Sequence, residues 1–438
     1  MNRFVDRATN ILVILYDLSM PVARVPGVLS FEDARRTVEE QASQVSRPKT
    51  ESVDLLAASG RVLAEPILAD RDLPPFPRST RDGYAVRAAD LARVPATLDV
   101  IGEVRAGESL ENIPKLIGNG QAASIMTGAP VPSGADAVVM VEYTAQQGKR
   151  VEITRSITPG ENVVPSGAEA QQGSVLVERG VRLNDAAIAL AATAGQSQVR
   201  VYIRPQVAVL TTGDEIVSID ATPGSTQIRN SNSYSLAVQI RNAGGESVLL
   251  PIAPDEPRKL RALIEEGLKY DLLLMTGGVS MGRYDLVEQV LEELKAEFFF
   301  TGTKIQPGRP LVFGKCGAGA SARENTGTYF FGLPGNPVST MVTFELFARP
   351  MLEALAGMSP RKLQFTYAKL NSEIRVKPGL RRFLPAILSG EFEASQVELV
   401  PWQGSGDVAA TARANCYVVI SPDRDRIPSG EFVAILSR

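Results

Sequence analysis

The sequence LLLMTGGVSMGRYDLVEQVLEEL, residues 272–294, decides the fold that we expect for this chain. It begins with aliphatic side chains, turns at the glycine pair Gly277 and Gly278, and returns to apolar residues at helical spacing after Asp285. That order predicts a buried strand, a tight loop and a helix. Such a loop exposes main-chain N–H groups that suit a phosphate or another oxyanion. Asp285 with Glu288 also fits an N-terminal capping box, so a purely structural role is open.

Strand and helix patterns alternate on both sides of this loop, over residues 206–355. A strand precedes Gly213, a helix is expected over 233–243, a strand over 247–252, and another helix opens at Asp255. These repeats imply a mostly parallel sheet that helices cover on both faces. Ligands bind beyond the carboxyl ends of such strands. The loops expected at that edge are 213–215, Asp255, 276–285, 307–310 and 334–337.

The composition excludes several classes of function. The 438 residues predict more than one domain, and 46 basic residues balance 49 acidic ones without a Lys/Arg block, so no nucleic-acid surface is expected. The absence of histidine excludes a Ser-His-Asp arrangement and an imidazole zinc site. The two cysteines, Cys316 and Cys416, are far apart and are interpreted as buried hydrophobes in a reducing compartment, the cytoplasm.

The first 28 residues form an extension. Its apolar run, residues 11–16, is much shorter than the roughly 20 residues of a membrane span, and no convincing cleavage site follows, so neither a membrane anchor nor a signal peptide is expected. Ser30 with Asp33 then forms a capping pattern for a helix that ends near residue 42. A second short helix is expected over 52–58, followed by an extended segment over 62–68.

A β-rich segment interrupts the chain before the alternating part. Residues 73–86, LPPFPRSTRDGYAV, contain prolines that prevent regular structure until Asp82, which stands in an Asp-Gly pair that could simply be a turn. Short strands with Gly/Pro turns follow, for example over 122–126 and 137–141. Their loops contain the sequence TGAPVP, which begins at Thr127.

Two further loop sequences follow the central one. KIQPGRPLVFGK covers residues 304–315, and in YFFGLPGNPVSTM, 329–341, Asn336 and Pro337 stand where an N-cap and a first helical residue belong. No G-x-x-x-x-G-K-[ST] element occurs, which argues against a P-loop ATPase. Beyond Pro360 the chain is expected to form a small β domain with strands over 364–370, 383–388, 417–420 and 432–436.

These observations divide the chain into six parts. They are an extension (1–28), a helical or linker segment that packs on the other domains (29–68), an inserted β-rich domain (69–168), a return linker (169–204), an α/β sheet domain (205–358) and a C-terminal β domain (359–438).

From about Leu29 to its C-terminus the chain closely resembles the molybdopterin molybdenumtransferase family, the MoeA proteins and the E domain of gephyrin. The motifs that carry this resemblance occur in the family's order: STRDGYAVRAAD, IMTGAPVPSGADAVVM, TTGDE, TGGVSMGRYD, QPGRP and GLPGNPVS. The resemblance implies a multidomain α/β plus β fold, with a three-layer molybdopterin-binding sheet domain like that of MogA and a C-terminal domain like a small β-barrel. It also implies an elongated homodimer whose active site lies between the sheet domain of one subunit and the inserted domain of the other.

Members of the family insert molybdate into adenylylated molybdopterin and release AMP, the final step of molybdenum cofactor biosynthesis. The resemblance places functional acids at Asp82, Glu169, Glu215, Asp255 and Asp285. Because carboxylates beside a pyrophosphate require a hard cation between them, we expect Mg²⁺ at Glu215, Asp255 and Asp285. Substrate-binding residues are expected at Thr127, Gly277, Gly278, Ser280, Lys304, Pro307, Arg309, Pro334, Asn336 and Ser339.

Molybdate is a tetrahedral dianion, so charge-assisted hydrogen bonds from Lys304, Arg309, Ser280 and Ser339 are expected to hold it. The chain departs from the family pattern at three places in the inserted domain. Arg81 replaces the usual Met, Ala168-Glu169 replaces the usual Glu-Asp, and Val164 replaces a frequent Arg. One hypothesis is that Arg81 supplies the cation that is lost at Val164.

Two alternatives remain at this point. A related single-domain adenylyltransferase shares the sheet domain, but it usually carries Thr-Gly where this chain has Val279-Ser280, and it lacks the inserted and C-terminal domains. A scaffold that keeps the fold and binds partners, as gephyrin does beside its enzymatic role, is the second alternative. The upstream adenylyltransferase is a further candidate partner of the enzyme.

Overall fold

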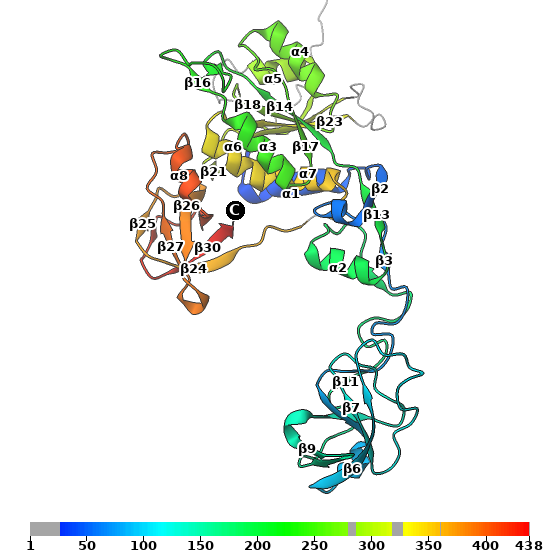
Figure 1. Ribbon diagram of the computed structural model, residues 1–438. Coiled ribbons are helices and arrows are strands. Elements are labelled where there is room, and N and C mark those ends of the chain that lie inside the picture. Colours follow the sequence, from blue (N-terminus) through cyan, green and yellow to red (C-terminus); the bar gives the residue numbers. More distant parts are fainter. Residues whose placement is uncertain (1–26, 279–285, 318–326, 360, 438) are drawn as a thin grey trace, which may run out of the picture.

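The computed structural model describes residues 27–278, 286–317, 327–359 and 361–437, which form an elongated molecule (Figure 1). The sheet domain and the C-terminal domain lie together at one end, and the inserted β domain lies at the other (Figure 1). A small lobe built from two separate segments of the chain joins them.

The central sheet has six strands, and its middle is the strand that opens the stretch 272–294. Their order is β17 (Glu246–Leu249), β14 (Gln206–Thr211), β18 (Leu272–Thr276), β23 (Thr328–Leu333), β22 (Val312–Cys316) and β19 (Glu297–Phe300). The first four strands are parallel, β22 runs antiparallel to β23, and β19 runs antiparallel to β22. The predicted mostly parallel sheet is confirmed.

Helices cover both faces of this sheet, as predicted (Figure 1). One face carries α1 (Phe31–Ser43), α3 (Asn232–Asn242), α6 (Pro337–Thr343), the π-helix η4 (Phe344–Ala348) and α7 (Arg349–Leu355); the other carries α4 (Pro257–Gly267) and α5 (Leu286–Glu293). Strand side chains alternate between the faces. Leu272 and Leu274 therefore belong to the first apolar core, and Leu273 and Met275 to the second.

The helix boundaries test several capping predictions. The α1 helix begins after Ser30, whose Oγ accepts a hydrogen bond of 3.1 Å from the Asp33 N–H, as predicted. Pro337 is the first residue of α6 after Asn336, also as predicted. The helix expected from Asp255 begins instead at Pro257, because proline is preorganised for the first helical turn. Asp285, half of the expected capping box, lies outside the described residues.

The lobe corrects two expectations. Residues 52–58 are not a helix: β2 (Thr50–Asp54) pairs with β13 (Gln198–Tyr202), and only the 3-10 turn η1 (Leu55–Ala58) follows. Residues 169–204 are more than a linker, since β12 (Val175–Val177) pairs with β3 (Ile67–Leu68), and α2 (Asp185–Thr193) closes an apolar core of the lobe's own. Burial of this core, which local patterns do not reveal, determines both outcomes.

The inserted domain is a six-stranded sheet with an apolar core on each face. Its order is β8 (Ala137–Met140), β5 (Gly83–Val86), β7 (Gln121–Ile125), β6 (Ala96–Val104), β10 (Arg150–Ile153) and β9 (Thr144–Gln147). The short turns η2 (Ala88–Leu91) and η3 (Val141–Tyr143) lie between strands, and β4 (Arg78–Ser79) pairs with β11 (Val163–Val164) where the domain joins the rest.

The C-terminal domain is a closed barrel of five strands. These are β24 (Thr366–Leu370), β26 (Arg381–Ser389), β27 (Gln396–Leu399), β28 (Cys416–Ile420) and β30 (Phe432–Ser437). The ring closes because β26 pairs with both β27 and β28. Its smaller elements are β25 (Ile374–Arg375), η5 (Phe392–Ala394), α8 (Val408–Arg413) and β29 (Arg426–Ile427). Cys316 and Cys416 are free and buried, as predicted.

Three further short strand pairs involve residues of the sheet domain. Strand β1 (Val28–Leu29) pairs with β20 (Gly302–Thr303), and β15 (Ile216–Val217) pairs with β16 (Ile228–Arg229). Strand β21 (Ile305–Gln306) extends the barrel by pairing with β26.

The central strand predicts a stability effect. Leu274 is fully buried in β18, so Leu274→Ala leaves a cavity that costs roughly 3 kcal/mol. We expect the melting temperature of the sheet domain, followed by calorimetry, to fall by roughly 6 to 12 °C. Leu56→Ala is the control, because Leu56 is 86% exposed in η1 and its loss should leave the transition in place. Equal effects of the two substitutions would contradict the assigned core.

Candidate functional site

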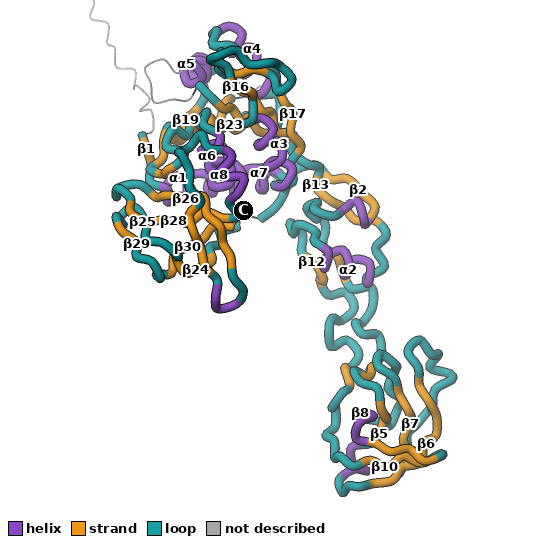
Figure 2. The backbone as a smooth tube through the Cα atoms, turned by 60° about the vertical axis from the view of Figure 1, so that its left-hand side comes forward, coloured by secondary structure: helices purple, strands orange, loops and turns teal. Residues whose placement is uncertain are grey.

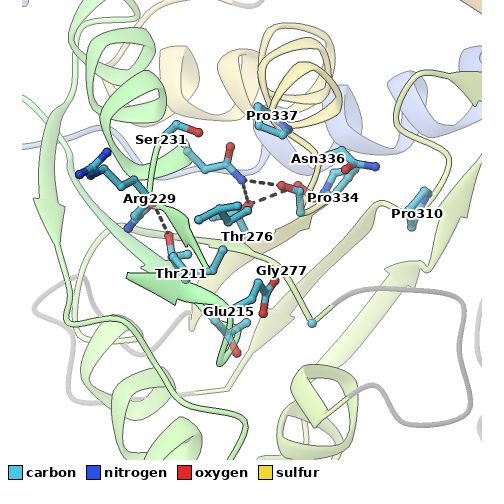
Figure 3. A pocket seen from close by; sticks show the side chains of 17 residues that line it. Thr211, Glu215, Arg229, Ser231, Thr276, Gly277, Pro310, Pro334, Asn336 and Pro337 are labelled. Carbon is cyan, nitrogen blue, oxygen red and sulfur yellow. Dashed lines mark hydrogen bonds between the residues drawn. The ribbon is translucent and has the colours of Figure 1, made fainter. Parts of the chain in front are cut away.

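A cavity of about 360 Å³ opens at the carboxyl ends of β14, β18 and β23 (Figure 3). Residues from four of the five predicted edge loops line it, together with the start of α3. The lining residues are Thr211, Thr212, Glu215, Ile216, Ile228, Arg229, Asn230, Ser231, Asn232, Thr276, Gly277, Gly278, Pro310, Pro334, Gly335, Asn336 and Pro337. The tertiary structure thus brings together loops that are more than a hundred residues apart.

The glycine pair, Gly277 and Gly278, lines this cavity, and a residue with a side chain would not fit at either position. Gly277 has φ 89°, and a Cβ on it would lie 2.3 Å from the carbonyl oxygen of Thr212. Gly278 has φ 62°, and its Cβ would lie 2.9 Å from Cγ2 of Val287. Both the left-handed backbone and the close approach therefore require glycine.

A buried hydrogen-bond network ties three walls of the cavity together (Figure 3). The Asn232 Nδ2 group donates to Oγ1 of Thr276 at 2.8 Å and to the carbonyl of Gly335 at 2.7 Å. Thr276 Oγ1 in turn donates to the carbonyl of Pro334 at 3.2 Å. Asn232, which is 7% exposed, therefore links the start of α3 to the ends of β18 and β23.

Sequence reasoning missed the contribution of α3. Its first turn and the preceding residues, Arg229 to Asn232, line the cavity, and Thr211 Oγ1 lies 2.8 Å from Oγ of Ser233. The available signal was the polar run NSNS, which spans residues 230–233 between a strand and a helix. A run of this kind also begins an ordinary helix, so it indicated a cap as readily as a site.

Two of the predicted metal ligands lie at this edge of the sheet. Glu215 lines the cavity, and Asp255 accepts a hydrogen bond of 3.1 Å from Oγ1 of Thr212. The side chain of Asp214 holds Asp255 in turn, since its Oδ1 accepts from the Asp255 N–H at 3.1 Å. These are carboxylate oxygens, the donors that Mg²⁺ prefers. Within the described ranges, no group of three or more acidic or cysteine side chains meets as a metal cluster, and Asp285 lies outside them.

The predicted molybdate-binding side chains do not surround this cavity. Lys304 and Arg309 are exposed on the connection between β20 and β22, and Pro307 and Ser339 are buried beside it without lining it. Pro334 and Asn336 do line it. Ser280 lies outside the described residues. Arg229 is the one Lys or Arg among the described residues that line the cavity.

Asp82 and Thr127 form a pair in the inserted domain, which lies at the opposite end of the molecule from the sheet domain that contains this cavity (Figure 1). Oδ1 of Asp82 accepts a hydrogen bond from the Thr127 backbone N–H at 2.6 Å and from its hydroxyl at 2.8 Å. Both donors favour the ionised carboxyl, and they lower the pKa of Asp82 below its ordinary value. Glu169 lies elsewhere, in an ion pair of 2.6 Å with Arg78.

Three family models match the chain in succession. Residues 29–195 match the MoeA N-terminal region (domain I and II), residues 208–354 a probable molybdopterin binding domain, and residues 367–437 the MoeA C-terminal region (domain IV). The chain is also 32% identical over 417 residues, 93% of its length and 98% of the relative's, to the molybdopterin molybdenumtransferase of Haemophilus influenzae. The chain belongs to the MoeA family.

Other members of the MoeA family agree with this assignment. The molybdopterin molybdenumtransferase of a Nostoc species is 40% identical over 72% of this chain and 71% of its own. The crystal structure of the molybdopterin biosynthesis MoeA protein from Pyrococcus horikoshii matches 94% of this chain and all of its own, with TM-score 0.73 and 28% identity. All the residues that line the cavity described above lie within the segment that matches the probable molybdopterin binding domain.

The Asp82–Thr127 pair makes a prediction about acidity. Removing the hydroxyl in Thr127→Val should raise the pKa of Asp82 towards its ordinary value, whereas Thr127→Ser should preserve the lowered pKa. A carboxyl NMR titration, with Asp82→Asn used to assign the signal, measures this. Because the folded-state pKa is the lower one, the pair stabilises the fold above the ordinary pKa, and this contribution is lost as the pH falls through the lowered one. An unchanged pKa in Thr127→Val would contradict the role of the hydroxyl.

Proposed function

We propose that this MoeA-family chain is a molybdopterin molybdenumtransferase, which inserts molybdate into adenylylated molybdopterin and releases AMP. The observation that carries the proposal is the cavity at the carboxyl edge of the sheet, in a chain similar over nearly its whole length to a relative of that name. The three matched regions of the MoeA family also favour this reading over a single-domain adenylyltransferase, which would lack the first and third.

The cavity lining suits a neutral heterocycle. Backbone N–H and C=O groups, Thr and Asn side chains and six proline or glycine residues surround it, with one carboxylate and one guanidinium. Such a lining offers hydrogen bonds and flat apolar walls, which are features of small-molecule sites. We therefore assign a ring system of the substrate to this cavity, and the anionic groups to its edge.

The acids at the edge fit a divalent cation. Glu215 and Asp255 would hold Mg²⁺, together with Asp285, and the bound ion would neutralise the pyrophosphate of the substrate. Lys304 and Arg309 remain our candidates for molybdate, because both are exposed cations on the connection that leads to Pro310, which lines the cavity. Without histidine, the reaction depends on positioning and charge neutralisation more than on a general base.

The position of Asp82 and Thr127 supports a shared active site. The inserted domain lies at the opposite end of the same chain from the cavity in both views (Figures 1 and 2). If this pair acts on the substrate, it must reach the cavity of a second copy. A twofold homodimer satisfies this, since each inserted domain then serves the other subunit's sheet domain.

The cellular setting is also part of the proposal. Among the helices of the described residues, none is long and apolar enough to cross a membrane. We place the enzyme in the cytoplasm, where the two free buried cysteines would remain reduced. The adenylyltransferase that makes its substrate is the proposed transient partner.

Turnover tests the proposed function directly. Purified protein supplied with adenylylated molybdopterin, molybdate and Mg²⁺ should release AMP and form cofactor, and Glu215→Gln should lower the rate by roughly a hundredfold. Glu246→Gln, which alters an exposed acid on the edge strand β17, is the matched control and should retain activity. A folded protein that shows no turnover would instead favour the scaffold alternative.

Subunit mixing tests the shared site. Asp82→Asn and Glu215→Gln should each be inactive alone, because each removes one half of every active site. Dimers re-formed from an equal mixture should recover roughly a quarter of wild-type activity, since half of the dimers would hold one intact site. Two mixed variants that stay inactive, although mixed dimers form, would show that both residues act within one chain.

A further inference from the structure

The inserted domain is joined to the lobe by a neck, residues 69–77 and 165–174, which the structure describes in full (Figure 2). Backbone hydrogen bonds hold the two segments side by side on the lobe side: Leu73 N–H donates to the carbonyl of Ala170 at 2.8 Å, and Glu169 N–H donates to that of Leu73 at 2.8 Å. None of the apolar clusters includes a neck residue. Ala69 and Leu73 are buried individually, but the neck has no apolar cluster of its own that would fix its shape.

Prolines weaken the part of the neck next to the inserted domain. Pro74, Pro75, Pro77 and Pro165 have no N–H to donate, so the backbone ladder cannot continue through them. One backbone hydrogen bond remains across this stretch, from Gly167 N–H to the carbonyl of Pro74 at 2.9 Å. Beyond it the ladder resumes only where β4 pairs with β11.

A single side-chain ion pair spans this proline stretch. Nη2 of Arg78 lies 2.6 Å from Oε1 of Glu169. Arg78 belongs to β4 of the inserted domain, whereas Glu169 pairs through its backbone with Leu73 on the lobe side. Among the described residues, it is the one ion pair that links the neck to the inserted domain.

The strand that carries Arg78 also supports the Asp82–Thr127 pair. Ser79 N–H donates to the carbonyl of Ala129 at 3.0 Å, and Gly128 N–H donates to that of Ser79 at 2.8 Å. The TGAP loop is thus hydrogen-bonded to Ser79 of β4, the residue that follows Arg78. Any tilt of β4 relative to the neck moves Thr127 and Asp82 with it.

We propose that Arg78 is a positioning residue that acts through Glu169: their ion pair sets the angle of the inserted domain on its neck. This inference rests on the proposed function, in which the inserted domain delivers Asp82 and Thr127 to a second copy's cavity. Glu169 then contributes to the reaction through its contact with Arg78. Where the family usually has Asp, the side chain of Glu169 is one methylene longer, which helps its carboxylate to reach Arg78. The pair biases the angle and does not lock it, because Arg78 is 37% and Glu169 54% exposed.

Charge reversal tests this proposal. Arg78→Gln and Glu169→Gln should each lower kcat/KM by about fivefold at most, the limit for an exposed pair, mainly through KM. Arg78→Glu/Glu169→Arg should restore kcat/KM to within about twofold of wild type, because it re-forms the pair with opposite polarity. Arg150→Glu is the matched control, since its exposed ion pair with Asp99 lies wholly within the inserted sheet.

The distance between the lobe and the inserted domain provides a second measurement. A variant that only lost catalytic activity would leave this distance unchanged. Both native cysteines are buried, so spin labels can be directed to Leu56→Cys on the lobe and Gln147→Cys on the inserted domain. The distance distribution should broaden in Arg78→Gln and in Glu169→Gln, and narrow again in the double reversal. It should be unchanged in Arg150→Glu.

The outcomes separate this inference from the proposed function. If the double reversal recovers no more kcat/KM than Glu169→Arg alone retains, and the distance distributions never change, Glu169 acts by chemistry or metal binding and the positioning role is wrong. If the distances respond as expected but wild-type protein shows no transferase turnover, the neck contact stands and the proposed function fails.

Discussion

The contact between Gly277 and the carbonyl of Thr212 is the constraint on which the candidate site depends. Because Gly277 has no Cβ, the backbone at the end of β18 can approach the backbone that follows β14 more closely than a residue with a side chain would allow. Gly277 also adopts a positive φ, in the left-handed region that favours glycine, and the chain turns there. The cavity exists because both strands end at the same level and their loops diverge from that point. Burial of β18 on both faces holds the contact in place, since its four apolar residues, 272–275, pack into two separate cores.

The candidate functional residues lie at the two opposite ends of the molecule. The edge of the sheet offers a neutral polar cavity with acids beside it, and the inserted domain offers an ionised carboxylate that Thr127 orients. A neck without an apolar cluster of its own joins the inserted domain to the lobe (Figure 2). In the proposed homodimer, this arrangement would make substrate binding and completion of the active site separate events, because the inserted domain of one subunit could approach after the substrate is bound to the other.

Much of the fold could be predicted from local sequence. The alternation of buried strands and amphipathic helices identified the sheet domain, and the capping residue Ser30 marked the start of α1 within one residue. The segments around Ser52 and after Glu169 were misread, because β2 pairs with a strand nearly 150 residues away and its side chains show no alternation that reveals this. Long-range pairing of that kind leaves little trace in a short window of residues.

By itself, the sequence determined the element types of the sheet domain, the glycine pair that lines the cavity and the edge of the sheet where the cavity opens, because periodicity and the absence of a Cβ are local properties. Only the tertiary structure decided which side chains meet there. It brought Asn232 and Thr211 to the cavity, left Lys304, Arg309 and Ser339 outside it, and joined Glu169 to Arg78. Those outcomes depend on strand order and on the path of the chain between distant segments, which no single stretch of residues encodes.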